Sequence, residues 1–186
     1  MEMDPLAHRR KSFMEKEEIY FWTATINKWQ MLLEQDEFKD IIIDSLKFLS
    51  DKGIIDVFGF VIMPNHIHLI WRINKNNGRE SAHASFLKHT AHSFKKKLLN
   101  VQPNKLIRYA VSANNKDYEF WKRDSLAVQL FSEDVAFQKL DYIHANPVSG
   151  RWNLAKDFCD YKYSTARFYQ LGVNDFGFIK DLRKEY

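Results

Sequence analysis

The stretch Phe58-Gly-Phe-Val-Ile-Met-Pro-Asn-His-Ile-His-Leu-Ile70 decides the fold, because it sets two apolar runs on either side of a turn. Residues 54–63 are apolar at most positions, which is typical of a strand buried on both faces. Pro64-Asn65 supplies the residue types of a tight turn. Residues 66–73 therefore predict a second strand that runs antiparallel to the first.

Two further strands are predicted on either side of this hairpin in the sequence. Residues 19–26 read Ile-Tyr-Phe-Trp-Thr-Ala-Thr-Ile, and residues 125–131 read Ser-Leu-Ala-Val-Gln-Leu-Phe. β-Branched and aromatic residues at this density favour strands. The chain is thus expected to contain four strands.

Three helices are predicted between and after these strands. Apolar residues recur at helical spacing over 36–50, where Gly53 ends the pattern, and over 81–99. A third helix begins after Ser132 and is expected to end near Ala145, because Pro147 disfavours helical geometry at the residue before it. The stripe that should face the core from the second helix is Leu87, Ala91, Phe94 and Leu98.

The order strand, helix, strand, strand, helix, strand, helix predicts an α+β fold. We expect a ferredoxin-like βαββαβ sandwich with an antiparallel sheet, helices on one face and a further C-terminal helix. Residues 1–17 are polar and mixed in charge, which indicates a flexible N-terminal arm. Residues 18–186 are expected to form one domain, irregular over 100–117 and with a short extension after Pro147.

The composition indicates a soluble globular protein, and its charge favours an anionic partner without requiring one. Hydrophobic residues make up 45% of the 186 positions and charged residues 28%, and the formal net charge is +4. This charge favours nucleic acid, as does the 15% share of aromatic residues, which can stack on unpaired bases. Cys159 is the single cysteine, and no apolar signal or membrane-spanning run is present, so we expect a cytoplasmic protein.

His66 and His68 are the first candidate site residues. Residues two apart on a strand project to one face, while Ile67 and Leu69 project to the other. Two imidazoles at this spacing can bind one divalent ion. The alternative is a pair of surface or hydrogen-bonded histidines at the end of a strand.

Tyr142 and Asn146 are the second candidate pair. They are four residues apart and therefore neighbours on one side of the third helix, which Phe137, Leu140 and Ile143 can seat against the sheet. A phenol becomes a workable nucleophile when a cation polarises the phosphate, and an amide oxygen can be a third ligand beside two imidazoles. The alternative is a core tyrosine followed by an Asn-Pro helix end.

Five separate blocks of the sequence resemble the HUH single-tyrosine transposases, in particular the branch associated with repetitive extragenic palindromes (REP). The blocks follow the order and spacing of that family from about Tyr20 to Tyr169. They are Phe58–Ile70, Ser85–Thr90, Phe120–Arg123, Gln138–Val148 and Tyr161–Tyr169.

The resemblance implies an enzyme that recognises a DNA hairpin and cuts single-stranded DNA beside it. Tyr142, on the C-terminal helix, would match the nucleophile, and His66, His68 and Asn146 would match the ligands of Mg²⁺ or Mn²⁺. Cleavage would give a 5′-phosphotyrosine and a free 3′-hydroxyl, which can later attack the linkage and rejoin strands. Relatives include monomers and dimers, so a homodimer is one of the assemblies open to this chain.

Four residues are expected to contact DNA. Lys88 and Lys95 on the second helix could line phosphates, and Trp121 and Arg123 could stack on or grip an unpaired base. The alternatives are a solvated helix face for the lysines and packing beside the sheet for Trp121 and Arg123.

Two other functions are compatible with this fold and charge. A hairpin-binding protein without catalysis would use the sheet for base stacking, but it would not need Tyr142 and Asn146 beside two histidines. A relaxase or replication initiator usually has a third histidine or a second tyrosine on the nucleophile's helix, and the sequence has neither.

Overall fold

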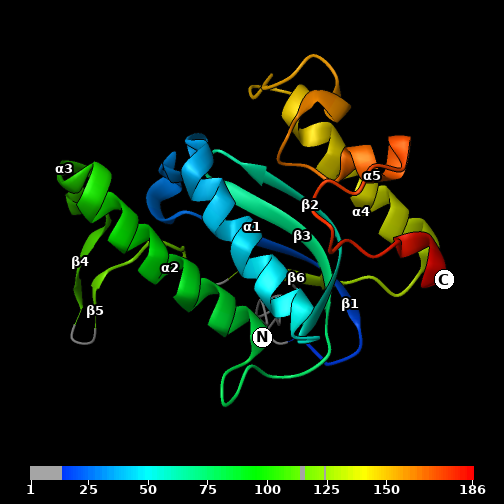
Figure 1. Cartoon of the computed structure of the whole chain (residues 1–186), viewed down its shortest axis with the longest axis horizontal. Helices are drawn as coiled ribbons and strands as arrows, with labels where there is room; N and C mark the ends of the chain where they lie inside the picture. The colour runs from blue at the N-terminus through cyan, green and yellow to red at the C-terminus, as the bar shows by residue number, and fades with distance from the viewer. Residues whose placement is uncertain (1–13, 114–115, 124) are drawn as a thin grey trace, which may run out of the picture.

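The computed structural model describes residues 14–113, 116–123 and 125–186 (Figure 1). Its centre is a four-stranded antiparallel sheet in the order β2-β3-β1-β6. The strands are Ile19–Thr25 (β1), Ile55–Met63 (β2), His66–Ile73 (β3) and Leu126–Gln129 (β6). The four predicted strands are thus confirmed, and so is the antiparallel pairing of the two strands that flank the Pro64-Asn65 turn.

Helices cover both faces of this sheet. α1 (Asp36–Asp51) and α2 (Ala82–Val101) pack on one face, and α4 (Glu133–Ala145) packs on the other (Figure 1). Ile67 and Leu69 of β3 belong to the core beneath α1 and α2, so the alternate residues of β3 face α4. The predicted α+β class is confirmed, and the sheet is the middle layer of three.

A small unit is inserted between α2 and β6. It consists of α3 (Pro103–Leu106) and an antiparallel ribbon of β4 (Ala110–Ala113) and β5 (Lys116–Tyr118). The expectation of an irregular segment over 100–117 is therefore wrong. Strands of three and four residues are too short to show a clear alternation of apolar and polar residues.

The buried stripe of α2 differs from the predicted one. Its two C-terminal members are buried as expected, but Leu87 and Ala91 are only half-buried. Thr90 points into the core instead, where its hydroxyl accepts a 2.9 Å hydrogen bond from the indole Nε1 of Trp121. Thr90 is polar, so a hydrophobic pattern cannot identify it as a buried residue. The pattern therefore selected the neighbouring apolar residue, Ala91, for the stripe.

The end of α4 lies where the sequence predicts it, but for a different reason. Asn146 keeps helical backbone angles, φ −52° and ψ −46°, so Pro147 does not force it out of helical geometry. The chain instead tightens into a 3₁₀ turn over Asn146–Val148. Pro147 lies in the first turn of this short helix, where a missing N–H leaves no helical bond unmade.

The segment that follows Pro147 covers the edge of the sheet at β2. It contains α5 (Ala166–Leu171), and isolated bridges join it to β2. Three backbone hydrogen bonds connect the two: Ile62 N–H to Tyr163 O at 2.9 Å, Thr165 N–H to Phe60 O at 3.0 Å and Lys180 N–H to Val57 O at 2.9 Å. An edge paired in this way is closed to other strands.

The remaining described residues form the start of the chain and short connections. Residues 1–13 of the expected arm lie outside the described part, and directly after them Met14 is buried. Short 3₁₀ turns occur at Asn27–Trp29, Leu32–Glu34, Ile107–Tyr109, Phe158–Asp160 and Leu182–Lys184. Among the described residues, no helix has the length and apolar character that crossing a membrane requires.

Candidate active site

His66 and His68 lie side by side on the face of β3 that α4 covers. Both are buried, with 9% and 7% of their surface exposed, and their ring centroids are 4.7 Å apart. Their side chains point away from the core that holds Ile67 and Leu69, as the alternation of the strand predicts. The two imidazoles are therefore neighbours in a shielded position.

A hydrogen bond orients each ring through its Nδ1 atom. Nδ1 of His66 lies 2.7 Å from Oδ1 of Asn65, which can only accept. Nδ1 of His68 lies 2.7 Å from the hydroxyl of Thr23, the residue that pairs with it across β1 and β3. Metal-binding histidines are typically held in this way by a partner on the other ring nitrogen, so both Nε2 atoms are suited to be ligands.

Burial lowers the pKa of both imidazoles. Desolvation is the main cause, and it lowers the pKa of His66 to about 4 and that of His68 to about 3. The positive charge of Arg151 acts in the same direction on His66, and those of His66 and Lys139 do so on His68. Both rings are thus neutral at pH 7 and can offer a nitrogen lone pair to an ion.

Tyr142 reaches the histidines from α4. Its ring centroid lies 5.4 Å from that of His68 and 6.1 Å from that of Phe21, and 49% of its surface is exposed. The strand with the imidazoles and the helix with the phenol are therefore brought together. The half-exposed position leaves the phenol open to a partner from solvent, unlike a core tyrosine.

Close packing between β2 and α4 holds Tyr142 at this position. Leu140 and Ile143 of α4 are buried against the sheet, and they meet β2 where it has a glycine. A Cβ atom on Gly59 would lie 2.7 Å from Cδ1 of Leu140 and 3.3 Å from Cδ1 of Ile143. Gly59 thus permits the close approach of the helix, because a Cβ here would force the side chain of Leu140 to shift.

Asn146 lies one helical turn after Tyr142 and is 9% exposed. Its Nδ2 donates a 2.8 Å hydrogen bond to the carbonyl of Tyr142, which leaves Oδ1 as the atom suited to an ion. Across the described residues, no group of three or more His, Cys, Asp or Glu side chains is placed to hold a metal. An ion here would need the two imidazoles and neutral oxygen donors, and Asn146 fits such a set.

Lys139 is a candidate site residue that the sequence analysis missed. Its Nζ lies 5.8 Å from the ring centroid of Tyr142 and 5.3 Å from that of Phe21. It precedes Tyr142 by three residues on α4, and residues at this spacing on a helix are neighbours, so the sequence could have indicated its place beside the phenol. A positive charge at this place can attract a phosphate toward the phenol.

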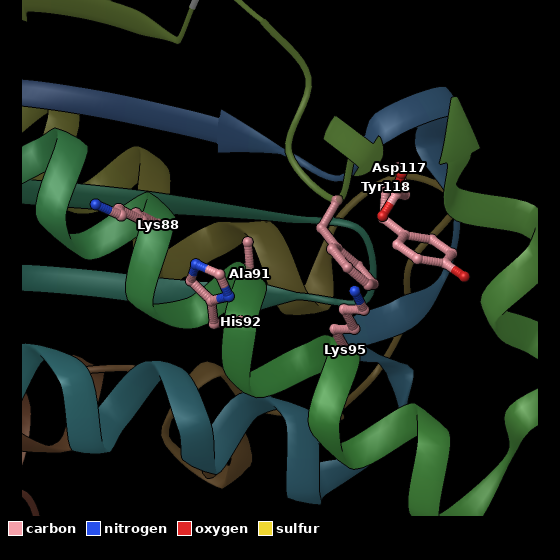
Figure 2. Close-up of a pocket in the computed structure, with 7 residues that line it drawn as sticks. Lys88, Ala91, His92, Lys95, Asp117 and Tyr118 are labelled. Atoms are coloured by element: carbon pink, nitrogen blue, oxygen red, sulfur yellow. The ribbon is translucent and has the colours of Figure 1, made fainter. Parts of the chain in front are cut away.

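Lys88 and Lys95 lie on α2, on the opposite side of the sheet from Tyr142. Both line a cavity of about 400 Å³, and Figure 2 shows them along α2 with Asp117 and Tyr118 of β5 nearby. Nζ of Lys88 is 2.6 Å from a carboxylate oxygen of Glu80, and Nζ of Lys95 lies 4.7 Å from the ring centroid of Tyr118. The structure does not bring these two lysines to the histidines.

Trp121 and Arg123 differ in their exposure. Trp121 is 7% exposed, and its indole N–H donates a hydrogen bond to Thr90, so its ring belongs to the core. Of the two roles considered for Trp121, the structure supports packing and not DNA contact. Arg123 is largely exposed and pairs with Glu119 at 3.0 Å. Arg123 is the one of the two that can reach DNA from this position.

Comparisons with known proteins bear on the fold. No family model matches the chain, and neither does any curated protein. The chain is similar to the solved structure of a REP-associated tyrosine transposase bound to a REP hairpin, with a TM-score of 0.60 and 16% sequence identity. The match covers 92% of this chain and 91% of that one. A candidate transposase from Deinococcus radiodurans is 18% identical with a TM-score of 0.39, over 72% of this chain and 92% of that one. The chain therefore shares the fold of a REP-associated tyrosine transposase, in agreement with the resemblance in its sequence.

Proposed function

We propose that this protein is a metal-dependent endonuclease and strand transferase of the transposase type, which acts on single-stranded DNA beside a hairpin. Its fold is that of a transposase solved with a REP hairpin, and hairpin recognition is carried over from that protein as part of the proposal. The positive charge of the chain agrees with a DNA partner.

The observation that carries the proposal is the approach of Tyr142 to His68. The phenol ring of Tyr142 on α4 lies 5.4 Å from the imidazole ring of His68 on β3, measured between ring centroids. The phenol is half-exposed, whereas the imidazole is buried and neutral. The ring of His66 lies beside that of His68, and Asn146 follows Tyr142 by one turn of the same helix. Packing of the core does not require this combination, whereas metal-assisted attack of a phenol on a phosphate can use it.

In the proposed reaction, Oη of Tyr142 attacks a phosphate of the DNA strand. A bond forms between Oη and phosphorus, and the bond between phosphorus and the 3′-oxygen breaks. The phenol loses its proton to solvent, and the 3′-oxygen gains one, so the products are a 5′-phosphotyrosine and a 3′-hydroxyl. Attack of a 3′-hydroxyl on the phosphotyrosine reverses the step, releases Tyr142 and rejoins a strand.

His66, His68 and Asn146 are the residues that would hold Mg²⁺ or Mn²⁺. When bound, such an ion polarises the phosphate and offsets the charge that develops during the attack. Asn65 and Thr23 fix the orientation of the two rings through Nδ1.

Basic residues outside this group would hold the rest of the DNA. Lys88, Lys95 and Arg123 are proposed to contact phosphates, so binding should weaken as the salt concentration rises. Trp121 is not part of this proposal, because its ring is buried in the core.

The test is the covalent adduct. We expect Tyr142→Phe to keep its affinity for hairpin oligonucleotides, taken from DNA next to the gene with single-stranded flanks, and to form no adduct with them in Mn²⁺. The adduct is measured as a protein–DNA band on a denaturing gel. Tyr186→Phe is the matched control, because Tyr186 is 43% exposed against 49% for Tyr142. An adduct with Tyr142→Phe would exclude Tyr142 as the nucleophile, and wild-type protein that binds but never forms one would be a hairpin-binding protein without catalysis.

A further inference from the structure

A groove of about 660 Å³ lies beside the candidate active site, and the chemistry described above does not use it. Asn65 forms part of its wall and is the residue that orients the ring of His66. Trp152, another wall residue, has its ring centroid 5.9 Å from that of His66. The volume falls within the range of roughly 300–1,000 Å³ that is common for small-ligand sites.

Large apolar side chains line this groove and remain open to solvent. Trp29 is 55% exposed, Met31 is 52% exposed and Leu154 is 40% exposed, and Trp152 is half-buried. Apolar surface gathered in one place on a folded domain marks a binding surface. Two indole rings in the same groove indicate a flat ligand.

The backbone holds Trp29 away from the core. Lys28 and Trp29 both have positive φ angles, 53° and 56°, which residues other than glycine rarely adopt. The carbonyl of Trp29 accepts a 3.4 Å hydrogen bond from Nδ2 of Asn65. The indole is therefore presented to solvent by a turn that is tied to the residue beside His66.

Positive charges accompany both indoles. Nζ of Lys122 lies 5.7 Å from the ring centroid of Trp29, and Cζ of Arg151 lies 4.9 Å from that of Trp152. Aromatic rings for stacking and cations for phosphates are the components of sites for single-stranded nucleic acid. Glu34 also lines the groove, and its carboxylate would repel a phosphate there. A base in the groove would therefore leave its phosphates near Lys122 and Arg151, outside the part that Glu34 lines.

We infer that this groove binds one unpaired base of the DNA strand that enters the active site, stacked on Trp29, with Trp152 as the second aromatic wall of the groove. The inference rests on the proposed function for the identity of the strand. A base held beside His66 fixes how far the strand extends to Tyr142. The groove thus sets which phosphate meets the nucleophile.

Binding to a single strand without a hairpin tests the inference independently of cleavage. The probe is a fluorescently labelled mixed-sequence oligodeoxynucleotide in EDTA, and the readout is its anisotropy. We expect Trp29→Ala and Trp152→Ala to raise Kd by about 5- to 150-fold, the range that corresponds to the loss of one base–aromatic stack. Trp29→Phe should keep most of the affinity, because it keeps a stacking surface.

Phe48→Ala is the matched control. Phe48 is a 53% exposed aromatic residue with Nζ of Lys52 at 5.8 Å from its ring centroid, but it does not line the groove: it lies near the C-terminal end of α1, whereas Glu34 of the groove precedes the start of that helix. We expect its Kd to equal that of the wild type. Melting temperatures of all variants show whether each one is folded; should Trp152→Ala not fold, Trp29→Ala decides the test.

Abasic sites locate the base. In a second probe, a hairpin fixes the register of its single-stranded flank; there, one abasic position of the flank should weaken binding to the wild-type protein as much as Trp29→Ala does, and in that variant the same position should have no further effect. Equal affinities for the tryptophan variants and the wild type, an equal loss in Phe48→Ala, or no binding of the single strand would overturn the inference. So would a change of oligomeric state without a change in DNA affinity, which would indicate a protein partner. A protein that forms no adduct but loses affinity on Trp29→Ala would refute the proposed enzyme and retain the base site.

Discussion

Three of the histidines that the structure describes are buried and neutral at pH 7. Desolvation is the main cause in each, and it lowers the pKa to about 4 for His66, about 3 for His68 and about 4 for His144. The pKa of a histidine in the unfolded chain is about 6.5. Between pH 6.5 and 4 the unfolded chain therefore binds protons that the folded chain does not, so the free energy of unfolding falls as the pH falls through this window.

His144 offers a test of this linkage that leaves the candidate ligands in place. Its Nε2 lies 3.0 Å from the hydroxyl of Thr165. We expect His144→Gln to reduce the pH dependence of the free energy of unfolding by up to about 1.4 kcal/mol per pH unit between pH 6.5 and 4. Urea unfolding in EDTA at pH 7 and pH 5 measures it, with the exposed His92→Gln as the control. An unchanged slope in His144→Gln would show that His144 is protonated in the folded state.

Single residues were predictable where a short-range pattern fixes their direction. Alternation on a strand placed His66 and His68 on one face, and helical spacing placed Asn146 beside Tyr142. Exposure was not predictable in the same way. Trp121 is buried because Thr90, far away in the sequence, binds its indole N–H. Trp29 is exposed because its positive φ angle turns the side chain outward. Lys28 and Trp29 are not residue types that favour positive φ, so the sequence could not predict this angle.

At the scale of elements, the position of α4 depends on a contact with β2. Gly59 permits it, since a Cβ at this position would lie 2.7 Å from Cδ1 of Leu140. The register of β2 and β3 also shifts between Val57 and Gly59, which bends the strand beneath the helix. The same helix carries Tyr142, so this contact sets the distance from the phenol to the histidines.

Gly59→Ala is expected to separate α4 from the sheet. Crowding of a packed core of this kind costs about 1–3 kcal/mol of stability. Because misplacement by about 1 Å can slow a reaction 100-fold, the rate of adduct formation should fall by roughly 10- to 100-fold. Gel assays of the adduct measure the rate, and urea unfolding measures the stability.

The double variant Gly59→Ala, Leu140→Ala supplies the control for this prediction. Removal of the Leu140 side chain makes room for the new methyl group, so the double variant should form the adduct faster than Gly59→Ala does. If Gly59→Ala alone forms the adduct at the wild-type rate, the contact does not set the position of Tyr142.

The succession of long elements could be predicted from the sequence, since strands and helices of eight or more residues show a clear period. The structure confirms β2, β3, α1, α2 and α4 close to the expected bounds. The face that each helix covers was only partly predictable. α1 and α2 share a face, as expected, but the sequence gives no sign that α4 covers the other face; this follows from the residues that α4 buries against β2.

At the scale of the whole molecule, a group of charges joins the end of the chain to the sheet. Asp56 of β2 is 5% exposed and lies 2.7 Å from Arg72 of β3 and 2.6 Å from Lys180. Arg72 in turn lies 2.6 Å from Glu185. Burial raises the pKa of Asp56, but the hydrogen bonds from Lys180 and Arg72 outweigh this effect and keep the pKa below its usual value.

Asp56→Ala is therefore expected to loosen the C-terminal segment from β2. The change leaves Arg72 and Lys180 without their shared partner, and we expect a loss of about 1–3 kcal/mol in the free energy of unfolding. Hydrogen exchange should rise at the amide of Lys180, which donates to Val57. Asp51→Ala breaks the exposed pair with Lys47 and is the control, with an expected loss below about 1 kcal/mol. If the two variants lost the same free energy of unfolding, the buried ion pairs of Asp56 would contribute no more stability than the exposed pair of Asp51.

The 2.8 Å bond from the side chain of Asn146 to the carbonyl of Tyr142 ties two parts of the proposed chemistry into a single turn of helix. A shift of that helix would move the attacking oxygen and the amide ligand by the same amount, so their spacing would survive any rearrangement of the whole element. Were two copies to exchange this helix, each would receive both parts at once. Such an exchange would transfer the whole helical turn, so Tyr142 and Asn146 would always pass to the other copy together.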